Sequence, residues 1–264
     1  MTIRVMTFNV RGSFHDDAAN DWDKRRDLNI ATIQKYAPDV IGFQEAQQGN
    51  IDDYARMLAG YDKELGYISI RTTQRYHQIP IYWKADRFEK INMGGFYLSE
   101  TPDEWSIGWQ STLVRAVTWV VLCDLSSNSE FLVLNTHFPH ERDADETRKH
   151  CADLIVAQLE QIAPNTPQIV MADFNTQPSS DAYQAFMQAG FVDTYTASGS
   201  THSVNTFHGF MGDDFEWQSG RIDWIFTKDG TQTFTAQSCE VITDAEPPIY
   251  PSDHYPVIAD LDIV

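Results

Sequence analysis

The chain has 264 residues, of which 42% are hydrophobic and 12% aromatic, so it can bury a substantial core and suits one large domain or two small ones. Its formal net charge of −19, from 38 acidic and 19 basic residues, opposes the approach of a polyanion and argues against a protein that scans nucleic acid by electrostatics. Three widely spaced cysteines argue against a disulfide framework or a zinc site, and no apolar run approaches the roughly 20 residues of a membrane span.

The first quarter of the chain alternates strand and helix. Thr2–Asn9 predicts a strand, and the apolar spacing of Trp22–Tyr36 predicts a helix that Pro38 stops. Asp39–Phe43 then predicts a short buried strand, and Ile51–Leu58 predicts a second helix.

The middle of the chain is rich in β-branched and aromatic residues separated by turn residues. Five strands are predicted there: Tyr67–Ile70, Ile79–Trp83, Arg87–Leu98, Leu113–Leu125 and Glu130–Asn135.

Helices return in the second half, where Asp143–Ile162 and Ser180–Gln188 predict helices on either side of a buried strand, Gln168–Ala172. Three further strands are predicted near the end: Ile222–Thr227, Thr233–Val241 and Val257–Ile263. Two blocks of alternating strand and helix, each finished by antiparallel strands, predict an α/β (α+β) fold with two sheets packed face to face and helices outside.

No linker or fixed-period repeat divides the sequence, so we expect one domain over residues 1–264. The chain opens on a strand pattern and not on a cationic segment followed by a long apolar one. We therefore expect a soluble, cytoplasmic monomer.

Polar side chains follow the predicted strands at the point where each strand ends. They are Asn9, Glu45, His137, the pair Asp173 and Asn175, and, just before the last strand, the pair Asp253 and His254. Taken singly, each has a simpler explanation. An Asn at a strand end, such as Asn9, commonly forms a turn, and the pair Asp173 and Asn175 could form an Asx turn that closes the strand. An acid at a strand end, such as Glu45, is commonly just solvated. Together they indicate a site, because ligands bind in the crevice outside the carboxyl ends of such strands.

Asp223 is an acid inside an otherwise apolar strand, so it needs a partner to offset its burial. Arg221 or a backbone donor is one alternative. The other is His254, because a carboxylate bonded to imidazole fixes the tautomer and raises the basicity of the ring.

Taken in order, these signals resemble the endonuclease/exonuclease/phosphatase superfamily, from Thr7 to Pro256. The most specific pieces are the Ala-Asp-Phe-Asn of residues 172–175 and the Ser-Asp-His of residues 252–254, and other segments resemble uncharacterised bacterial members. The resemblance implies the family fold, a four-layer αββα sandwich like that of DNase I.

The resemblance also implies a metal-assisted phosphoester hydrolase. Glu45 would be the main Mg²⁺ ligand, with Mn²⁺ a possible substitute, helped by Asn9 and Asp253. Hard carboxylate and amide oxygens suit these cations.

In the same resemblance His254 would activate the attacking water, with Asp223 orienting the imidazole. Asp173 and Asn175 would position the nucleophile and the phosphoryl oxygens, and His137 would bond the phosphate or protonate the leaving group. Arg115 would be a further phosphate clamp.

One departure from the family lies before the strand at Ile79–Trp83, where many relatives carry a glutamate that pairs with their equivalent of His137. This chain has Tyr76-His77-Gln78 instead, and His77 is interpreted as an exposed loop histidine. The leaving-group role of His137 therefore has less support than the base role of His254.

Three hypotheses about function follow. The first is a phosphoesterase acting on a phosphorylated small molecule, a lipid-linked phosphate or a nucleotide. The second is a DNase- or RNase-type nuclease of the same mechanism, for which Arg71, Arg75, Arg115 and the loop Trp105–Trp109 offer only a thin groove. The third is a binding module that has lost turnover. Substrate choice is expected to lie in Arg71–Gln78 and in a long loop over residues 198–218.

Overall fold

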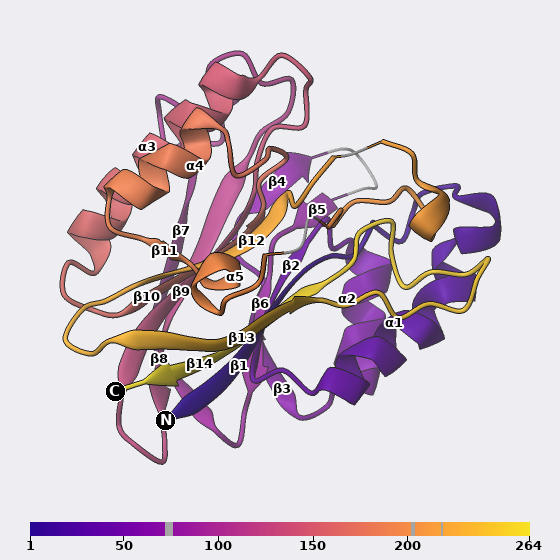
Figure 1. Ribbon diagram of the computed structural model, residues 1–264. Helices are drawn as coiled ribbons and strands as arrows, with labels where there is room; N and C mark the ends of the chain where they lie inside the picture. The colour runs from indigo at the N-terminus through magenta and orange to yellow at the C-terminus, as the bar shows by residue number, and fades with distance from the viewer. Residues whose placement is uncertain (72–75, 202–203, 218) are drawn as a thin grey trace.

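The computed structural model describes residues 1–71, 76–201, 204–217 and 219–264. Two six-stranded sheets lie face to face between two layers of helices (Figure 1). The α/β character and the four-layer αββα arrangement expected from the sequence are confirmed.

The first sheet contains β1 (Thr2–Asn9), β2 (Val40–Gln44), β3 (Tyr61–Glu64), β6 (Ile81–Lys84), β13 (Phe234–Val241) and β14 (Val257–Ile263), in the order β13-β14-β1-β2-β6-β3. The second contains β7 (Phe88–Tyr97), β8 (Ala116–Asp124), β9 (Glu130–His137), β10 (Gln168–Asp173), β11 (Val192–Asp193) and β12 (Asp223–Lys228), in the order β11-β12-β10-β9-β8-β7. A small separate ribbon pairs β4 (Ile68–Arg71) with β5 (Tyr76–Gln78).

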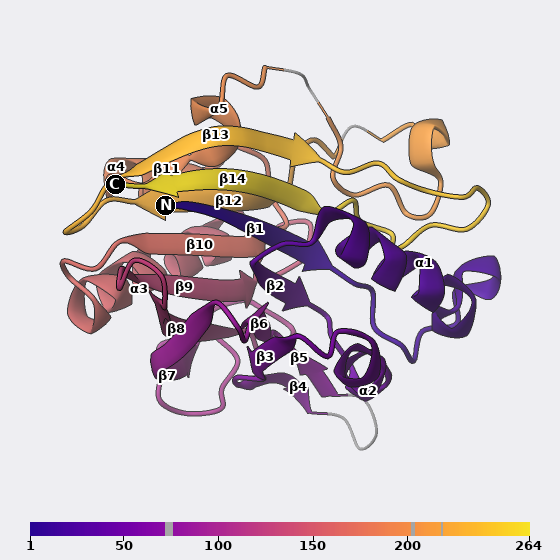
Figure 2. The ribbon, with the colours of Figure 1, turned by 90° about the horizontal axis from the view of Figure 1, so that it is seen from below.

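The helices cover the outer faces of the sheets, as Figures 1 and 2 show. α1 (Trp22–Tyr36) and α2 (Gln48–Met57) pack on the first sheet, and α3 (Asp145–Ile162) and α4 (Asp181–Gln188) pack on the second. Three large apolar cores result, one under each helix layer and one between the sheets, and Ile79, Tyr97, Val114 and Ala116 form a small fourth cluster. Shorter turns of helix are η1 (Ala18–Asn20), α5 (Thr194–Ala197) and η2 (Gly212–Asp214).

Each sheet holds one central parallel pair, and the carboxyl ends of the two pairs point to the same region. β1 runs parallel to β2 with Asn9 opposite Gln44, and β9 runs parallel to β10 with His137 opposite Asp173. Side chains bridge the two sheets there, since Asn9 Nδ2 donates to Asp173 Oδ2 at 2.9 Å. Polar groups from both sheets therefore gather at one edge of the sandwich.

All predicted elements are present, with boundaries shifted by at most three residues. The sequence analysis did not predict β3, β5, β11 and α5. These elements are two to four residues long, too short for apolar periodicity to mark them. Substrate choice was expected to lie in residues 71–78 and 198–218. Residues 72–75 of the first segment and residues 202–203 and 218 of the second lie outside the described part of the chain. No helix in the described part of the chain is long and apolar enough to cross a membrane.

Candidate active site

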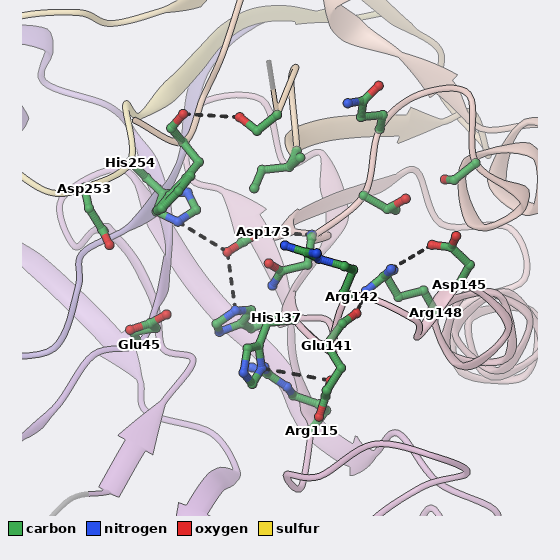
Figure 3. Close-up of a pocket in the computed structure, with 18 of the residues that line it drawn as sticks. Glu45, Arg115, His137, Glu141, Arg142, Asp145, Arg148, Asp173, Asp253 and His254 are labelled. Carbon is green, nitrogen blue, oxygen red and sulfur yellow. Dashed lines mark hydrogen bonds and ion pairs between the residues drawn. The ribbon is translucent and has the colours of Figure 1, made fainter. Parts of the chain in front are cut away.

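Strand ends and two loops deliver the candidate side chains to one region. Figure 3 shows Glu45, His137, Asp173, Asp253 and His254 directed toward a common space. All five line one cavity of about 940 Å³. The cavity lies outside the carboxyl ends of β1, β2, β9 and β10, where the sequence predicted a site.

Asp173 is the centre of this cluster. Its Oδ2 accepts a hydrogen bond from Asn9 and lies 3.3 Å from His137 Nε2 and 3.7 Å from His254 Nε2. Burial by itself raises the pKa of the Asp173 carboxyl, but the facing imidazoles of His254 and His137 outweigh it and hold that pKa well below its usual range. Asp173 is therefore an ionised acceptor for donors on three sides.

His254 is held from behind by Asp223. Its Nδ1 donates to Asp223 Oδ2 at 3.0 Å, which leaves Nε2 directed to the cavity. Burial disfavours the charged imidazolium, but Asp223 and Asp173 together raise the pKa of His254 to about 10. Burial disfavours the charged form of Asp223 as well, and for a carboxyl group this raises the pKa, here to about 6. Asp223 Oδ1 has no hydrogen-bond partner among the described residues.

Of the two partners that the sequence left open for Asp223, His254 is therefore the one observed. Arg221 instead forms a buried ion pair with Asp193. Asp223 lies behind His254 and is 1% exposed, so it contacts the cavity only through the imidazole.

Glu45 and Asp253 supply carboxylates on the opposite side of the cluster. Burial raises the pKa of Glu45, but the charges of His137 and His77 and a hydrogen bond from Asn9 (3.2 Å) bring it down to about 2. Burial raises the pKa of Asp253.

Asn9 is buried beneath Glu45 and presents its amide nitrogen to the acids. The oxygen of the same amide accepts from the backbone N–H of Arg11 at 3.1 Å. In this orientation Asn9 is a donor that spaces Glu45 from Asp173, and a ligand role for its oxygen requires the amide to be rotated.

Two residues that lie beside the acids were not predicted from the sequence. Arg11 Nε lies 3.8 Å from Asp253 Oδ2, and His15 Nε2 lies 3.8 Å from Glu45 Oε2. Both belong to the polar loop after β1, whose sequence has no period, and only the path of that loop brings them to the acids.

Three residues of the site adopt the left-handed backbone region although none is glycine: Arg11 (φ 47°), Glu45 (φ 59°) and Asn175 (φ 50°). Asn175 is held there by its N–H, which donates to Asp173 Oδ1 at 2.9 Å, and by its amide, which donates to the carbonyl of Phe138 at 3.1 Å. Such conformations persist where surrounding bonds over-determine them.

Arg115 is 3% exposed and lines the same cavity. Its Nη2 donates to His140 Nδ1 at 3.1 Å, and its Nε has no hydrogen-bond partner among the described residues. A buried guanidinium that lines a cavity is suited to an anionic oxygen.

His77 is not the exposed loop histidine that the sequence suggested. It lies on β5, is half-buried and lines the cavity. Gln47 Nε2 donates to its Nε2 at 2.6 Å, and burial lowers the pKa of His77 to about 4. A neutral imidazole thus lines the cavity, whereas the resemblance implied a glutamate near this position.

The donor chemistry fits a hard divalent cation. Glu45 and Asp253 offer carboxylate oxygens on one side of the cavity, without a thiol beside them among the described residues. Asp173, Asp223 and His254 also bring possible ligand atoms within 4.8 Å of one another. The 3.0 Å hydrogen bond between Asp223 and His254 already occupies two members of that group, so Glu45 and Asp253 are the residues that could hold a cation.

The chain resembles known proteins over nearly its whole length. A model of the Endonuclease/Exonuclease/phosphatase family matches residues 6–254. An endonuclease/exonuclease/phosphatase from Bacteroides vulgatus is 30% identical with a TM-score of 0.89, covering 100% of both chains.

A mannosyl-6-phosphatase from Bacteroides thetaiotaomicron is 27% identical with a TM-score of 0.85, covering 98% of this chain and 99% of that one. An uncharacterised protein, L388, of Acanthamoeba polyphaga mimivirus is 29% identical over 185 residues, which are 66% of this chain and 67% of the viral protein.

Proposed function

Because the chain belongs to the Endonuclease/Exonuclease/phosphatase family, whose members are hydrolases acting on phosphoester bonds, we propose that it hydrolyses a phosphomonoester or phosphodiester with water activated at His254. One observation carries the proposal: His254 directs Nε2 into the cavity while buried Asp223 holds its Nδ1 at 3.0 Å. That is the arrangement of a general base whose tautomer is set by a carboxylate.

The proposed reaction uses a divalent cation, Mg²⁺ with Mn²⁺ as substitute, held by Glu45 and Asp253. A cation held there would offset the negative charge of the phosphoryl oxygens and, by like-charge repulsion, would favour the neutral form of His254. Asn9 keeps Glu45 and Asp173 apart by donating to both, at 3.2 and 2.9 Å.

The remaining residues handle protons and phosphoryl charge. His254 takes a proton from water at Nε2, and the carboxylate of Asp223 stabilises the imidazolium that forms. Asp173 aligns the water with the help of Asn175. His137 and Arg115 donate to phosphoryl oxygens or to the departing oxygen, where negative charge develops.

We propose a phosphorylated small molecule, a lipid-linked phosphate or a nucleotide as substrate class. The similarity to a mannosyl-6-phosphatase supports including sugar phosphates among them. The net charge of −19 disfavours long nucleic acid, whose phosphates would be repelled over the whole surface.

Turnover of a broad panel of phosphate esters with Mg²⁺ tests the proposal. His254→Ala should abolish turnover, and Asp223→Asn should lower kcat by about a hundredfold or more because the tautomer is no longer fixed. His150→Ala, which removes a half-buried imidazole stacked on Trp109 outside the cavity lining, is the matched control and should behave as wild type.

Two results would contradict the proposal. Near-normal rates in Asp223→Asn would remove the assigned pair. If the wild-type protein hydrolyses none of the esters faster than His254→Ala does, the hypothesis of a binding module that has lost turnover would be favoured instead.

A further inference from the structure

The cavity is larger than the reacting groups need. Its volume of about 940 Å³ is that of a site for a whole small molecule, whereas the proposed chemistry uses only the end near Glu45 and His254. Figure 3 shows Arg142, Asp145 and Arg148 on the side away from Glu45 and Asp253. This second wall has no role in the proposed hydrolysis.

An exposed indole stands on that wall. Trp217 lines the cavity and is 65% exposed, an unusual degree for so large an apolar side chain. Its backbone is fixed because its carbonyl accepts from Ser219 N at 2.9 Å and from Asn205 Nδ2 at 3.3 Å. The guanidinium of Arg142 lies 5.5 Å from the ring centroid, so the ring is supported while most of it stays open.

The charges around Trp217 do not suit a second phosphate. Arg148 is neutralised, since its Nη2 donates to Asp145 Oδ1 at 2.7 Å and its Nη1 donates to the carbonyls of Pro139 and Glu141 at 2.9 Å. Asp181 adds a further acid to the lining of the cavity. Of the two arginines on this wall, only Arg142 has no carboxylate partner among the described residues, and the acids would repel another anion.

The same wall suits a polyhydroxylated ring. Carboxylates accept from hydroxyl groups, and Thr176, Gln177 and Ser179 add further polar side chains to the lining of the cavity. The flat face of Trp217 offers apolar contact to the C–H face of a ring. An aromatic plane edged with acids and amides thus matches a neutral sugar.

We propose that Trp217, Arg142, Asp145 and Asp181 bind the sugar ring of a sugar phosphate, so that the enzyme is a sugar-phosphate phosphomonoesterase. This inference rests on the proposed function. Water attacks phosphorus, the bond between phosphorus and the sugar oxygen breaks, a proton passes to that oxygen, and the products are the free sugar and inorganic phosphate.

Trp217→Ala tests the subsite, with Trp105→Ala as matched control because Trp105 is also exposed and does not line the cavity. The substrates are glucose 6-phosphate, glycerol 3-phosphate, which has no ring, and AMP, which carries a base. Trp217→Ala should raise KM for glucose 6-phosphate about tenfold at unchanged kcat and leave glycerol 3-phosphate unchanged, whereas Trp217→Phe should keep most of the affinity.

A rise in KM confined to AMP would overturn the proposal in favour of a nucleobase, and unchanged KM for glucose 6-phosphate would overturn it outright. Calorimetry of glucose 6-phosphate binding to His254→Ala and to the double variant His254→Ala/Trp217→Ala tests the subsite without turnover. Weaker binding to the double variant would support the subsite, and equal binding would overturn it. If the wild type hydrolyses no ester, the proposed function fails, while the calorimetric comparison still supports or overturns the sugar subsite.

Discussion

Arg25 offers a sharp test of how the site is held together. Its side chain is fully buried on α1 and is hydrogen-bonded to no carboxylate among the described residues. Nε donates to the carbonyl of Asn20 at 2.8 Å, Nη1 donates to those of Val10 and Pro251 at 2.9 Å, and Nη2 donates to that of Arg11. One guanidinium therefore ties the loop after Asn9 to the segment that leads into Asp253 and His254.

The expected cost of Arg25→Met follows from these bonds. The Pro251 carbonyl keeps a donor, because Asn29 Nδ2 also reaches it at 3.0 Å. The other three carbonyls lose a charged donor, and each such bond contributes about 1.5–3 kcal/mol. Part of that loss is offset because a guanidinium no longer has to be buried, so we expect the free energy of unfolding to fall by about 3–5 kcal/mol.

The same change should slow catalysis, because the acids and His254 lose their common anchor. A displacement of about 1 Å costs on the order of a hundredfold in rate, so we expect kcat to fall by that factor. Urea unfolding followed by circular dichroism measures the stability, and hydrolysis of a phosphate ester with Mg²⁺ measures the rate.

Arg26→Met is the matched control. Arg26 is the next residue on α1, and its Nε donates to Asp27 at the surface at 3.1 Å. Its loss should change the free energy of unfolding by less than about 0.5 kcal/mol. If both variants unfold at the same urea concentration, or if Arg25→Met keeps full activity, Arg25 does not anchor the site as argued.

Two further predictions concern the cation and pH. Glu45→Gln should lower Mg²⁺ affinity at least about tenfold while leaving the fold intact, and equal affinity in calorimetry would contradict the assignment. Asp124 is buried, which raises its pKa, but hydrogen bonds from Ser126, Ser127 and Arg87 bring that pKa down to about 2. Because the folded pKa is depressed, this carboxylate stabilises the protein above about pH 4 and loses that effect as the pH falls toward 2. The difference in unfolding free energy between wild type and Asp124→Asn should therefore shrink between pH 5 and about 2, and a constant difference would refute the reasoning.

The strand ends were readable from the sequence because their signal is local. Apolar runs that stop at or just before Asn9, His137 and Asp173 mark both the strand and the polar groups at its end. The same patterns were sufficient to predict two sheets with outer helices. Short elements such as β3 and β5 lack enough residues to show a period.

The sequence by itself determined which side chains are available to the candidate site and that strands deliver them. Only the tertiary structure decided that Asp223 pairs with His254 and not with Arg221, that Asn9 turns its nitrogen to the acids, and that Trp217 stands over the far wall of the cavity. The physical reason is that each of these contacts depends on sheet order, on packing between layers or on the path of a loop. Those arise from the sum of many long-range interactions, which no short stretch of residues contains.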